Sequence, residues 1–361
     1  IKWRSIFLDE AQAIKNHLTQ TNQVACKLKA DYRVCMTGTP VENNLGELWS
    51  LFNFLMPGLF GTRTEFRASF QRPIEEFDNQ EAKERLTERL KPFLLRRTKD
   101  QVACELPKKT VMVKFFELEG DQRDLYETVR VHMLEKVRNA IATKGLVRSR
   151  IVILDAILKL RQVCCDPRLL RLPAAQNVKS SAKLFLLREM LSQLMEEGRK
   201  VLLFSQFTSM LDLIVNEVNA MNVQYVELRG TTTDRKTPVE QFQKGKVPLF
   251  MISLRAGGTG LNLTAADTVI HYDPWWNPAV EDQATDRAYR IGQDKPVFVY
   301  KLIGLGTIEE KLLEMQGRKR KFANAIYDDS SCSVDITEED IESLFAPLAQ
   351  SESSGLASND D

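Results

Sequence analysis

Two adjacent carboxylates follow an apolar run near the start of the chain. Asp9 and Glu10 come directly after Trp3–Leu8, which is predicted to be a strand. In nucleotide hydrolysis, one carboxylate of such a pair can hold Mg²⁺, usually through water, while the next orients or deprotonates the attacking water. Taken alone, such a pair is more often the cap that opens the following helix.

Two later segments could lie close to phosphate groups. Residues 37–40 read Thr-Gly-Thr-Pro, and Gly257, Gly258 and Gly260 follow another predicted strand. Glycine lets the backbone approach a phosphate closely, and the first turn of a helix offers free N–H groups to an anion. Each segment by itself is equally typical of an ordinary tight turn.

Two arginines are candidates for neutralising the charge of a transferred phosphate. Arg287 and Arg290 are three residues apart on a helix predicted over 279–291, so they are expected to share one face. Arginines held over a γ-phosphate stabilise the charge of the transition state. In isolation, a surface ion pair with Asp286 or Glu281 explains them equally well.

The elements that must position these groups follow an alternating pattern. Short apolar runs alternate with helix-like segments from Val201 onward, which is typical of a parallel sheet covered on both faces. Strands are predicted at residues 201–204, 224–228, 248–254, 268–272 and 297–303, and helices at 210–221, 238–244 and 279–291. In such sheets ligands bind outside the carboxyl ends of the strands, where the candidate residues lie.

The chain is expected to hold four parts. Residues 1–110 are the carboxyl-terminal part of a first α/β domain, in which Ile6–Leu8 and Val34–Met36 are predicted to be buried strands. Residues 111–178 are a helical insertion and linker, with long helices predicted at 125–141 and 152–164, and 179–327 are a second, complete α/β domain. An acidic and largely disordered tail follows at 328–361, interrupted by one amphipathic helix at 337–345. Residues 110–120 are expected to lead out of the first domain.

The composition restricts the class of protein. Hydrophobic residues make up 43% and charged residues 27%, an ordinary soluble balance, and the longest uncharged stretch, 48–62, is too short and too interrupted to cross a membrane. The six cysteines form no Cys-x-x-Cys pair and the three histidines are widely separated, so a zinc site is not expected.

The net charge of +1 hides an asymmetry along the chain. Residues 1–321 hold all 50 basic side chains but only 39 of the 49 acidic ones, and the remaining acidic residues lie in the tail. A basic body is compatible with a polyanionic partner, although by itself it is weak support for one.

Together and in this order, the motifs resemble those of the Swi/Snf-like ATPases of helicase superfamily 2. Residues 9–12, Asp-Glu-Ala-Gln, resemble the Walker B box, and 36–61 look like the segment that follows it in this family. Residues 94–109, 201–214, 253–267 and 272–293 match the later motifs. The resemblance covers residues 1–325, and the Trp-Asn-Pro with its Gln/Asp/Arg spacing in the last motif is its most specific part.

The resemblance implies a fold and an activity. The fold is two RecA-like parallel-sheet lobes, the first partial and the second complete here, with helical insertions between them. The activity is a DNA-dependent ATPase that uses ATP and Mg²⁺ to translocate on duplex DNA. Asp9 would serve Mg²⁺ and Glu10 the attacking water. Arg287 and Arg290 would reach the nucleotide from the second lobe.

The resemblance also implies contacts for several other residues. Gly258 and Gly260 would lie near the nucleotide, and Gln283 would help couple the lobes. Trp276 and Asn277 would face the DNA, although core packing remains an alternative for the tryptophan. The weaker DNA candidates are Arg255 and the pair Arg96 and Arg97, which could instead brace the lobe interface. Gln12 and Tyr289 stand where the family commonly has His, and Thr259 stands where it commonly has Val; none of these removes a charge that hydrolysis requires.

One family motif is missing from these residues. The chain contains no Gly-x-x-x-x-Gly-Lys-Ser/Thr loop, since its Gly245-Lys246 pair is followed by Val247. In the family this loop cradles the β- and γ-phosphates and lies upstream of the Asp-Glu box. The chain, which begins at Ile1 in mid-strand, is therefore expected to be a fragment that holds half of the nucleotide site and barely turns ATP over alone.

Two other functions remain open at this point. A non-hydrolysing DNA-binding scaffold could retain the fold, and a strand-separating helicase would share the superfamily. The expected partners are double-stranded DNA and a protein bound to it, with no membrane, and the chain is expected to act as a monomer associated with intracellular DNA in a nucleoid or nucleus.

Overall fold

The computed structural model describes residues 1–38, 45–77, 79–95, 97, 99–103, 105–178, 181–254, 256, 260–275, 278–315, 317 and 338–348. The chain divides into two compact units between Val102 and Ala103, slightly before the expected boundary at 110. The described C-terminal segment belongs to the second unit. No described helix is both long and apolar enough to cross a bilayer.

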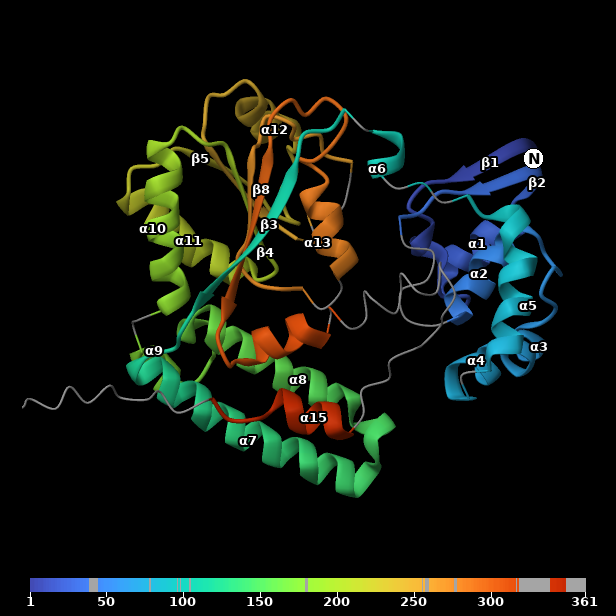
Figure 1. Ribbon diagram of the computed structural model, residues 1–361, viewed down its shortest axis with the longest axis horizontal. Helices are drawn as coiled ribbons and strands as arrows, with labels where there is room; N and C mark the ends of the chain where they lie inside the picture. Colours follow the sequence, from blue (N-terminus) through green and yellow to red (C-terminus); the bar gives the residue numbers. More distant parts are fainter. Residues whose placement is uncertain are drawn as a thin grey trace, which may run out of the picture. The chain divides into compact units, whose positions relative to one another are not determined.

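The first unit begins with two parallel strands, β1 (Lys2–Leu8) and β2 (Lys29–Cys35), whose register pairs Leu8 with Cys35 (Figure 1). The short helix η1 (Ala11–Ile14), α1 (Gln20–Lys27) and α2 (Leu45–Leu55) provide the apolar residues packed with them. The expectation that these strands are buried is wrong in part, since Phe7 is 63% exposed. The helices cover only one face of the pair, and alternate side chains of a strand point to opposite faces.

The remainder of the first unit is a small helical cluster. Phe60 packs edge-to-face against Phe52, Phe66 and Phe70, with ring centroids 5.3 to 6.2 Å apart, so aromatic packing holds these helices together. The elements are α3 (Arg63–Phe66), the π-helix η2 (Arg67–Gln71), α4 (Arg72–Phe77), α5 (Gln80–Leu90), η3 (Lys91–Phe93) and α6 (Lys99–Val102).

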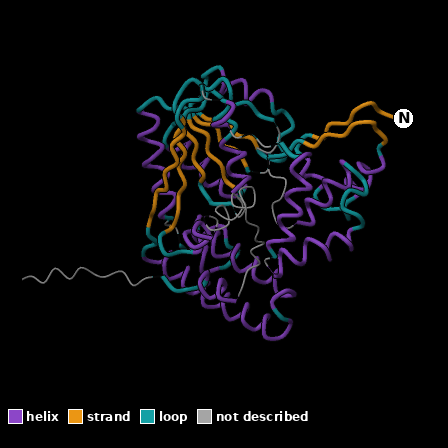
Figure 2. The backbone as a smooth tube through the Cα atoms, turned by 45° about the vertical axis from the view of Figure 1, so that its right-hand side comes forward, coloured by secondary structure: helices purple, strands orange, loops and turns teal. Residues whose placement is uncertain are grey.

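A six-stranded parallel sheet in the order β3-β8-β7-β4-β6-β5 forms the centre of the second unit (Figures 1 and 2). Every residue of β4, β6 and β7 is buried, as in a sheet covered on both faces. The strands are β3 (Lys109–Phe116), β4 (Val201–Ser205), β5 (Tyr225–Leu228), β6 (Leu249–Ser253), β7 (Thr268–His271) and β8 (Val297–Gly304). The five strands predicted after Val201 are confirmed.

Helices cover the two faces of this sheet with separate cores. Val201 and Leu203 pack with α10 (Ala182–Glu196) and α11 (Thr208–Ala220), whereas Leu202 and Phe204 face the core that includes α12 (Lys236–Gln243) and α13 (Pro278–Thr285). Figure 1 shows α10 and α11 on one side of the strands and α13 on the other. Consecutive residues of one strand therefore serve opposite faces.

The structure corrects the expectation for residues 110–120. They do not simply lead out of the first domain, because β3 pairs with β8 over eight residues and forms one edge of the second sheet. The pattern of β3 is that of a strand, but its partner follows much later in the chain. Local sequence therefore could not assign this strand to a sheet.

A long helical hairpin forms part of the second unit. It consists of α7 (Gly120–Lys144) and α8 (Leu146–Cys165), joined at Gly145 in a left-handed conformation (φ 74°), and is followed by η4 (Pro167–Leu169) and α9 (Pro173–Asn177). The predicted helices at 125–141 and 152–164 are confirmed, each with a few more residues.

The acidic tail contains a packed segment. The expected helix is confirmed as α15 (Glu338–Leu344), and residues 338–348 dock on α7 (Figure 1). The expected disorder is therefore wrong for residues 346–348, which follow the predicted helix. Arg138 donates to both carboxylate oxygens of Glu342 at 2.8 and 3.0 Å, and Arg130 donates to the Phe345 carbonyl at 2.8 Å. Burial of Ile341 and Phe345 adds apolar contact. Residues 328–337 and 349–361 lie outside the described residues.

A buried ion pair joins the start of α10 to the segment that follows β8. Lys183, at the start of α10, pairs with Glu309, which follows β8, and both side chains have no exposed surface. The Lys183 ammonium lies 5.3 Å from the ring of Phe116 and 5.4 Å from that of Tyr272. Glu309 also accepts the Gly304 N–H at 3.1 Å, so the carboxylate is hydrogen-bonded as well as paired.

Replacing Lys183→Met is expected to lower the free energy of unfolding of the second unit by about 3–5 kcal/mol, because the Glu309 carboxylate would remain buried without its cation. Hydrogen exchange of the β4 and β7 amides reports the stability of this unit alone.

The double variant Lys183→Met/Glu309→Gln should recover much of the loss, since no buried charge remains uncompensated. Lys159→Met, which breaks the partly exposed pair with Asp155, is the control and should cost less than about 1 kcal/mol. A Lys183→Met loss no larger than that of Lys159→Met would contradict a central role for the buried pair.

Candidate functional site

The polar segments after β1 and β2 lie together at one edge of the first unit. Met36 N–H donates to the Leu8 carbonyl at 2.8 Å, and Ala11 N–H donates to the Met36 carbonyl at 3.0 Å, so the two strand ends are joined. Thr37 Oγ1 donates to Gln12 Oε1 at 2.8 Å, and Gln12 Nε2 donates to Glu10 Oε2 at 2.6 Å. Gln12, which differs from the residue common in the resembled family, thus links Glu10 to the threonine.

Glu10 adopts a backbone conformation that is unusual for a residue with a side chain. Its φ of 49° and ψ of 50° lie in the left-handed region, which costs about 1–2 kcal/mol for a residue other than glycine. The hydrogen bond from Ala11 to Met36 and the bond from Glu10 N–H to Asp9 Oδ1 at 2.9 Å hold this turn. Strain of this kind concentrates at functional sites.

The carboxylates of Asp9 and Glu10 fit a partial magnesium site. Both residues are exposed, and no group of three or more His, Cys, Asp or Glu among the described residues could hold a metal by itself. Mg²⁺ commonly keeps several waters and takes only one or two protein carboxylates together with substrate phosphates. An exposed pair at a strand end has the oxygen chemistry for that arrangement.

The glycine-rich turn after β6 is described only in part. Gly260 has φ +47°, a conformation that a side chain would strain. Ala256 N–H donates to Ser253 Oγ at 3.3 Å, which closes the turn at the strand end. Arg255, Gly257, Gly258 and Thr259 lie outside the described residues.

Arg287 and Arg290 do not share a helical face, contrary to the expectation from their spacing. The helix α13 ends at Thr285, and the Arg287 carbonyl accepts the Leu263 N–H at 3.0 Å instead of continuing the helix. Gln293 Nε2 stabilises the turn by donating to the carbonyls of Ala288 and Ala266 at 3.0 and 2.7 Å. Arg287 is 7% exposed, whereas Arg290 is exposed to solvent.

The other predicted residues lie in different places. Gln283 is half-buried on α13 in the second unit, and Arg97 is exposed in the first. Trp276, Asn277 and Arg96 lie outside the described residues. The structure thus brings Asp9 and Glu10 together in the first unit and places Gly260, Gln283 and the two motif arginines in the second.

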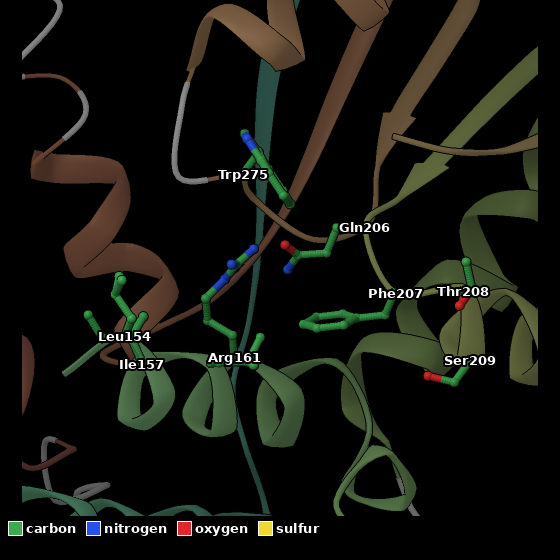
Figure 3. Close-up of a pocket in the computed structure, with 9 residues that line it drawn as sticks. Leu154, Ile157, Arg161, Gln206, Phe207, Thr208, Ser209 and Trp275 are labelled. Atoms are coloured by element: carbon green, nitrogen blue, oxygen red, sulfur yellow. The ribbon is translucent and has the colours of Figure 1, made fainter. Parts of the chain in front are cut away.

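A cavity that the sequence did not indicate lies beside the ends of β4 and β7. It has a volume of about 450 Å³ and is lined by apolar residues of α8 and by Arg161, Gln206, Phe207 and Trp275. Figure 3 shows the side chains of Arg161 and Gln206 pointing toward one another next to Trp275. Arg161 could not be recognised from the sequence as a buried residue, because a lysine or arginine on a long helix is usually exposed to solvent.

His271 at the end of β7 is part of the core. Its ring stacks on Phe204 with centroids 5.6 Å apart, and Nε2 lies 2.9 Å from Thr285 Oγ1 on α13. Burial disfavours the charged ring and lowers the pKa of His271 from 6.5 to about 4. The ring is therefore neutral near pH 7, and its contact with Thr285 joins β7 to α13.

The chain resembles known proteins over most of its length. The SNF2-related domain matches residues 1–169, and the helicase conserved C-terminal domain matches 182–292. The putative ATP-dependent helicase/translocase YwqA of Bacillus subtilis is 37% identical over 352 residues, which cover 96% of this chain and 38% of that protein. The SWI/SNF-related matrix-associated actin-dependent regulator of chromatin subfamily A member 1 of Homo sapiens is 37% identical over 324 residues, 86% of this chain and 30% of that one.

Two solved structures from Sulfolobus solfataricus are also similar. The SWI2/SNF2 ATPase core in complex with dsDNA is 34% identical with a TM-score of 0.53, covering 95% of this chain and 73% of that chain. The SWI2/SNF2 ATPase core domain is 36% identical with a TM-score of 0.55, covering 95% and 71%. The α/β architecture with parallel sheets expected from the sequence is confirmed.

His271→Gln is expected to change how stability depends on pH. Below pH 6.5 the unfolded chain binds a proton at His271 that the folded chain does not bind until about pH 4, so this residue lowers the free energy of unfolding as the pH falls. Between pH 7.5 and 5, the free energy of unfolding of the native chain should fall by about 2 kcal/mol more than that of the variant.

Hydrogen exchange of the β7 amides, measured at both pH values, tests this dependence. His132→Gln, on the exposed side of α7, is the control and should follow the native chain. Parallel pH profiles for the native chain and His271→Gln would show that burial of the neutral ring contributes nothing to the pH dependence.

Proposed function

The chain belongs to the SNF2-related family of Swi/Snf ATPases, and we propose that it forms part of a motor that hydrolyses ATP to move along duplex DNA. The observation that carries the proposal is the Asp9–Glu10 pair in its strained turn, with both carboxylates exposed and Glu10 oriented through Gln12 and Thr37. The chain spans about a third of the length of the curated relatives that it matches, so the activity of the whole protein is part of this proposal.

The first unit supplies the groups that act on water. Asp9 would hold Mg²⁺, which would neutralise charge on the phosphates of ATP. Glu10 accepts a hydrogen bond from Gln12 at Oε2, and its carboxylate is proposed to orient the attacking water or take its proton. Thr37 donates to the Gln12 amide in turn, so the orientation of the Glu10 carboxylate depends on the ends of both β1 and β2.

The second unit supplies positive charge and close backbone contacts. Arg287 and Arg290 are proposed to approach the transferred phosphate, and Gly258 and Gly260 to let the backbone lie near the nucleotide. Gln283, on α13, is proposed to couple nucleotide binding to movement of this unit. Such motors act by closing two lobes around ATP.

The 361 residues contain no Gly-x-x-x-x-Gly-Lys-Ser/Thr loop to cradle the β- and γ-phosphates. We therefore expect these residues by themselves to bind ATP weakly and to turn it over barely, if at all. The carboxylates and arginines still favour an enzyme over a non-hydrolysing scaffold, because a scaffold has no use for all four.

Duplex DNA is the proposed substrate surface. The basic surplus of residues 1–321 suits a phosphate backbone, and one similar structure is described as a complex with dsDNA. Trp276 and Asn277 are the proposed DNA contacts, with Arg255 and Arg97 as weaker candidates. Contacts chiefly to phosphates imply low sequence specificity and strong dependence on salt. We further propose that the motor translocates without separating the DNA strands and that it acts as a monomer. Its proposed task is to displace a DNA-bound protein inside a nucleoid or nucleus.

ATP turnover by the parent protein, with a phosphate loop present, should rise strongly on addition of duplex DNA. Glu10→Gln should lower the DNA-stimulated kcat by about 10²–10⁴-fold, because an amide can neither take the proton nor hold the same charge. Glu88→Gln, an exposed change on α5, is the matched control and should leave kcat unaltered.

Two outcomes would contradict parts of the proposal. Turnover by the 361 residues alone that Glu10→Gln abolishes would show that the missing loop is dispensable. No turnover by the parent protein, with or without DNA, would favour the scaffold.

Trp276→Ala tests the DNA contact. The concentration of duplex DNA that gives half-maximal stimulation should rise about tenfold, which corresponds to a loss of about 1.4 kcal/mol of binding free energy. Phe185→Ala, an exposed aromatic change on α10, is the control. An unchanged DNA dependence in Trp276→Ala would reject this role.

A further inference from the structure

Arg161 connects the helical hairpin to the end of a central strand. It lies on α8, is 5% exposed, and donates from Nη2 to the carbonyl of Pro274, which follows β7. Its guanidinium carbon lies 5.9 Å from the centroid of the Phe207 ring, which follows β4 (Figure 3). One side chain of the insertion therefore reaches between the ends of two sheet strands.

A buried carboxylate beside Arg161 belongs to the same cluster. Asp273 is fully buried and accepts the Gln206 N–H at 3.1 and 3.2 Å from its two oxygens. Burial raises the pKa of Asp273, and the positive charge of Arg161 opposes this rise. The arginine thus compensates a charge that the strand end would otherwise hold in a low-dielectric environment.

The peptide group that Arg161 contacts is held from its other end as well. Trp275 N–H, which belongs to the same peptide bond as the Pro274 carbonyl, donates to Glu281 Oε1 on α13 at 2.6 Å. Glu281 is itself buried and pairs with Lys301 on β8. The carbonyl and the N–H of one planar peptide unit are therefore held by an arginine of α8 and a glutamate of α13.

Close packing does not hold the 274–275 peptide in place of these two hydrogen bonds, because it borders a cavity. The cavity of about 450 Å³ borders the peptide, and within the described structure Arg161 Nε and Gln206 Nε2 face it without a hydrogen-bond partner. The direction in which the chain leaves β7 therefore depends on the two charged side chains. The next residues along the chain are Trp276 and Asn277.

We propose that Arg161 is a positioning residue for DNA-stimulated turnover: it and Glu281 orient the 274–275 peptide, and through it the segment that meets the DNA. The helical hairpin is in this way a part of the DNA response and not a passive insertion. The inference rests on the proposed function, because it deepens the assignment of Trp276 and Asn277 to the DNA contact.

The test uses Arg161→Lys and Arg161→Met in the parent protein. Lysine keeps the buried positive charge opposite Asp273 but lacks the planar fork that reaches Pro274. Both variants should raise the duplex DNA concentration for half-maximal stimulation by about tenfold or more, as misplacement of a binding group does. The KM for ATP without DNA should stay within about twofold, which a general loss of folding would not allow.

Two further measurements separate positioning from charge and from stability. Arg148→Met removes an exposed cation near the start of the same helix and should shift the DNA dependence far less. Hydrogen exchange at the Trp275 amide should accelerate in Arg161→Lys, while the β4 and β7 amides keep their protection.

Hydrogen exchange is measured without DNA, so it tests whether Arg161 holds the 274–275 peptide even if the parent protein shows no DNA-stimulated turnover. Absence of stimulated turnover would overturn the proposed function and not the positioning role. Unchanged exchange at Trp275 in Arg161→Lys would overturn the positioning role. A stimulated parent protein in which Arg161→Lys and Arg148→Met have the same DNA dependence would overturn it as well.

Discussion

The buried pair of Lys183 and Glu309 is the constraint on which the arrangement of the second unit depends. Two charges without solvent are stable only if they are paired and further hydrogen-bonded, and Glu309 accepts the Gly304 N–H as well as the Lys183 ammonium. Other hydrogen bonds lie close by in the chain. Tyr272 OH donates to the Cys165 carbonyl at 3.0 Å, and the Tyr126 hydroxyl accepts the Ile308 N–H at 2.8 Å. The ends of α8, β7 and β8 therefore meet at one polar cluster. Arg161 lies one helical turn before Cys165, so the same cluster sets the position of its side chain beside Pro274.

In the proposed motor the two units would contribute different groups, and this difference follows from their sheets. Parallel strands gather polar side chains at their carboxyl ends, where neighbouring strands stop at the same edge. In the first unit this edge carries Asp9 and Glu10 in a strained turn, joined to Thr37 through Gln12. In the second unit the corresponding edge is more enclosed, with Asp273 and Glu281 buried and used to hold backbone. Exposed carboxylates can bind a metal ion and water, whereas buried carboxylates are better placed to hold backbone groups in position.

The arginine pair of the last motif illustrates where spacing alone misleads. Three residues separate Arg287 from Arg290, and in a continuous helix they would share a face. The Arg287 carbonyl is instead bonded to Leu263, and the side chain of Gln293 takes carbonyls that a further helical turn would use. Leu263 lies far from this segment in the sequence, so no local pattern could show that it bonds the Arg287 carbonyl. The predicted helix over 279–291 was wrong beyond Thr285, and the roles of the two arginines stay a prediction.

The sequence by itself determined the five strands from Val201 onward, the two helices of the hairpin, the polar residues at the strand ends and the family, because these depend on local periodicity and on motifs in a given order. Only the tertiary structure decided that β3 joins the second sheet, that residues 338–348 dock on α7, that one face of β1 stays exposed, and that Arg161 holds the 274–275 peptide. Each of these depends on a partner far away in the chain. Burial and hydrogen bonding between distant residues are properties of the packed molecule, and local periodicity carries no record of them.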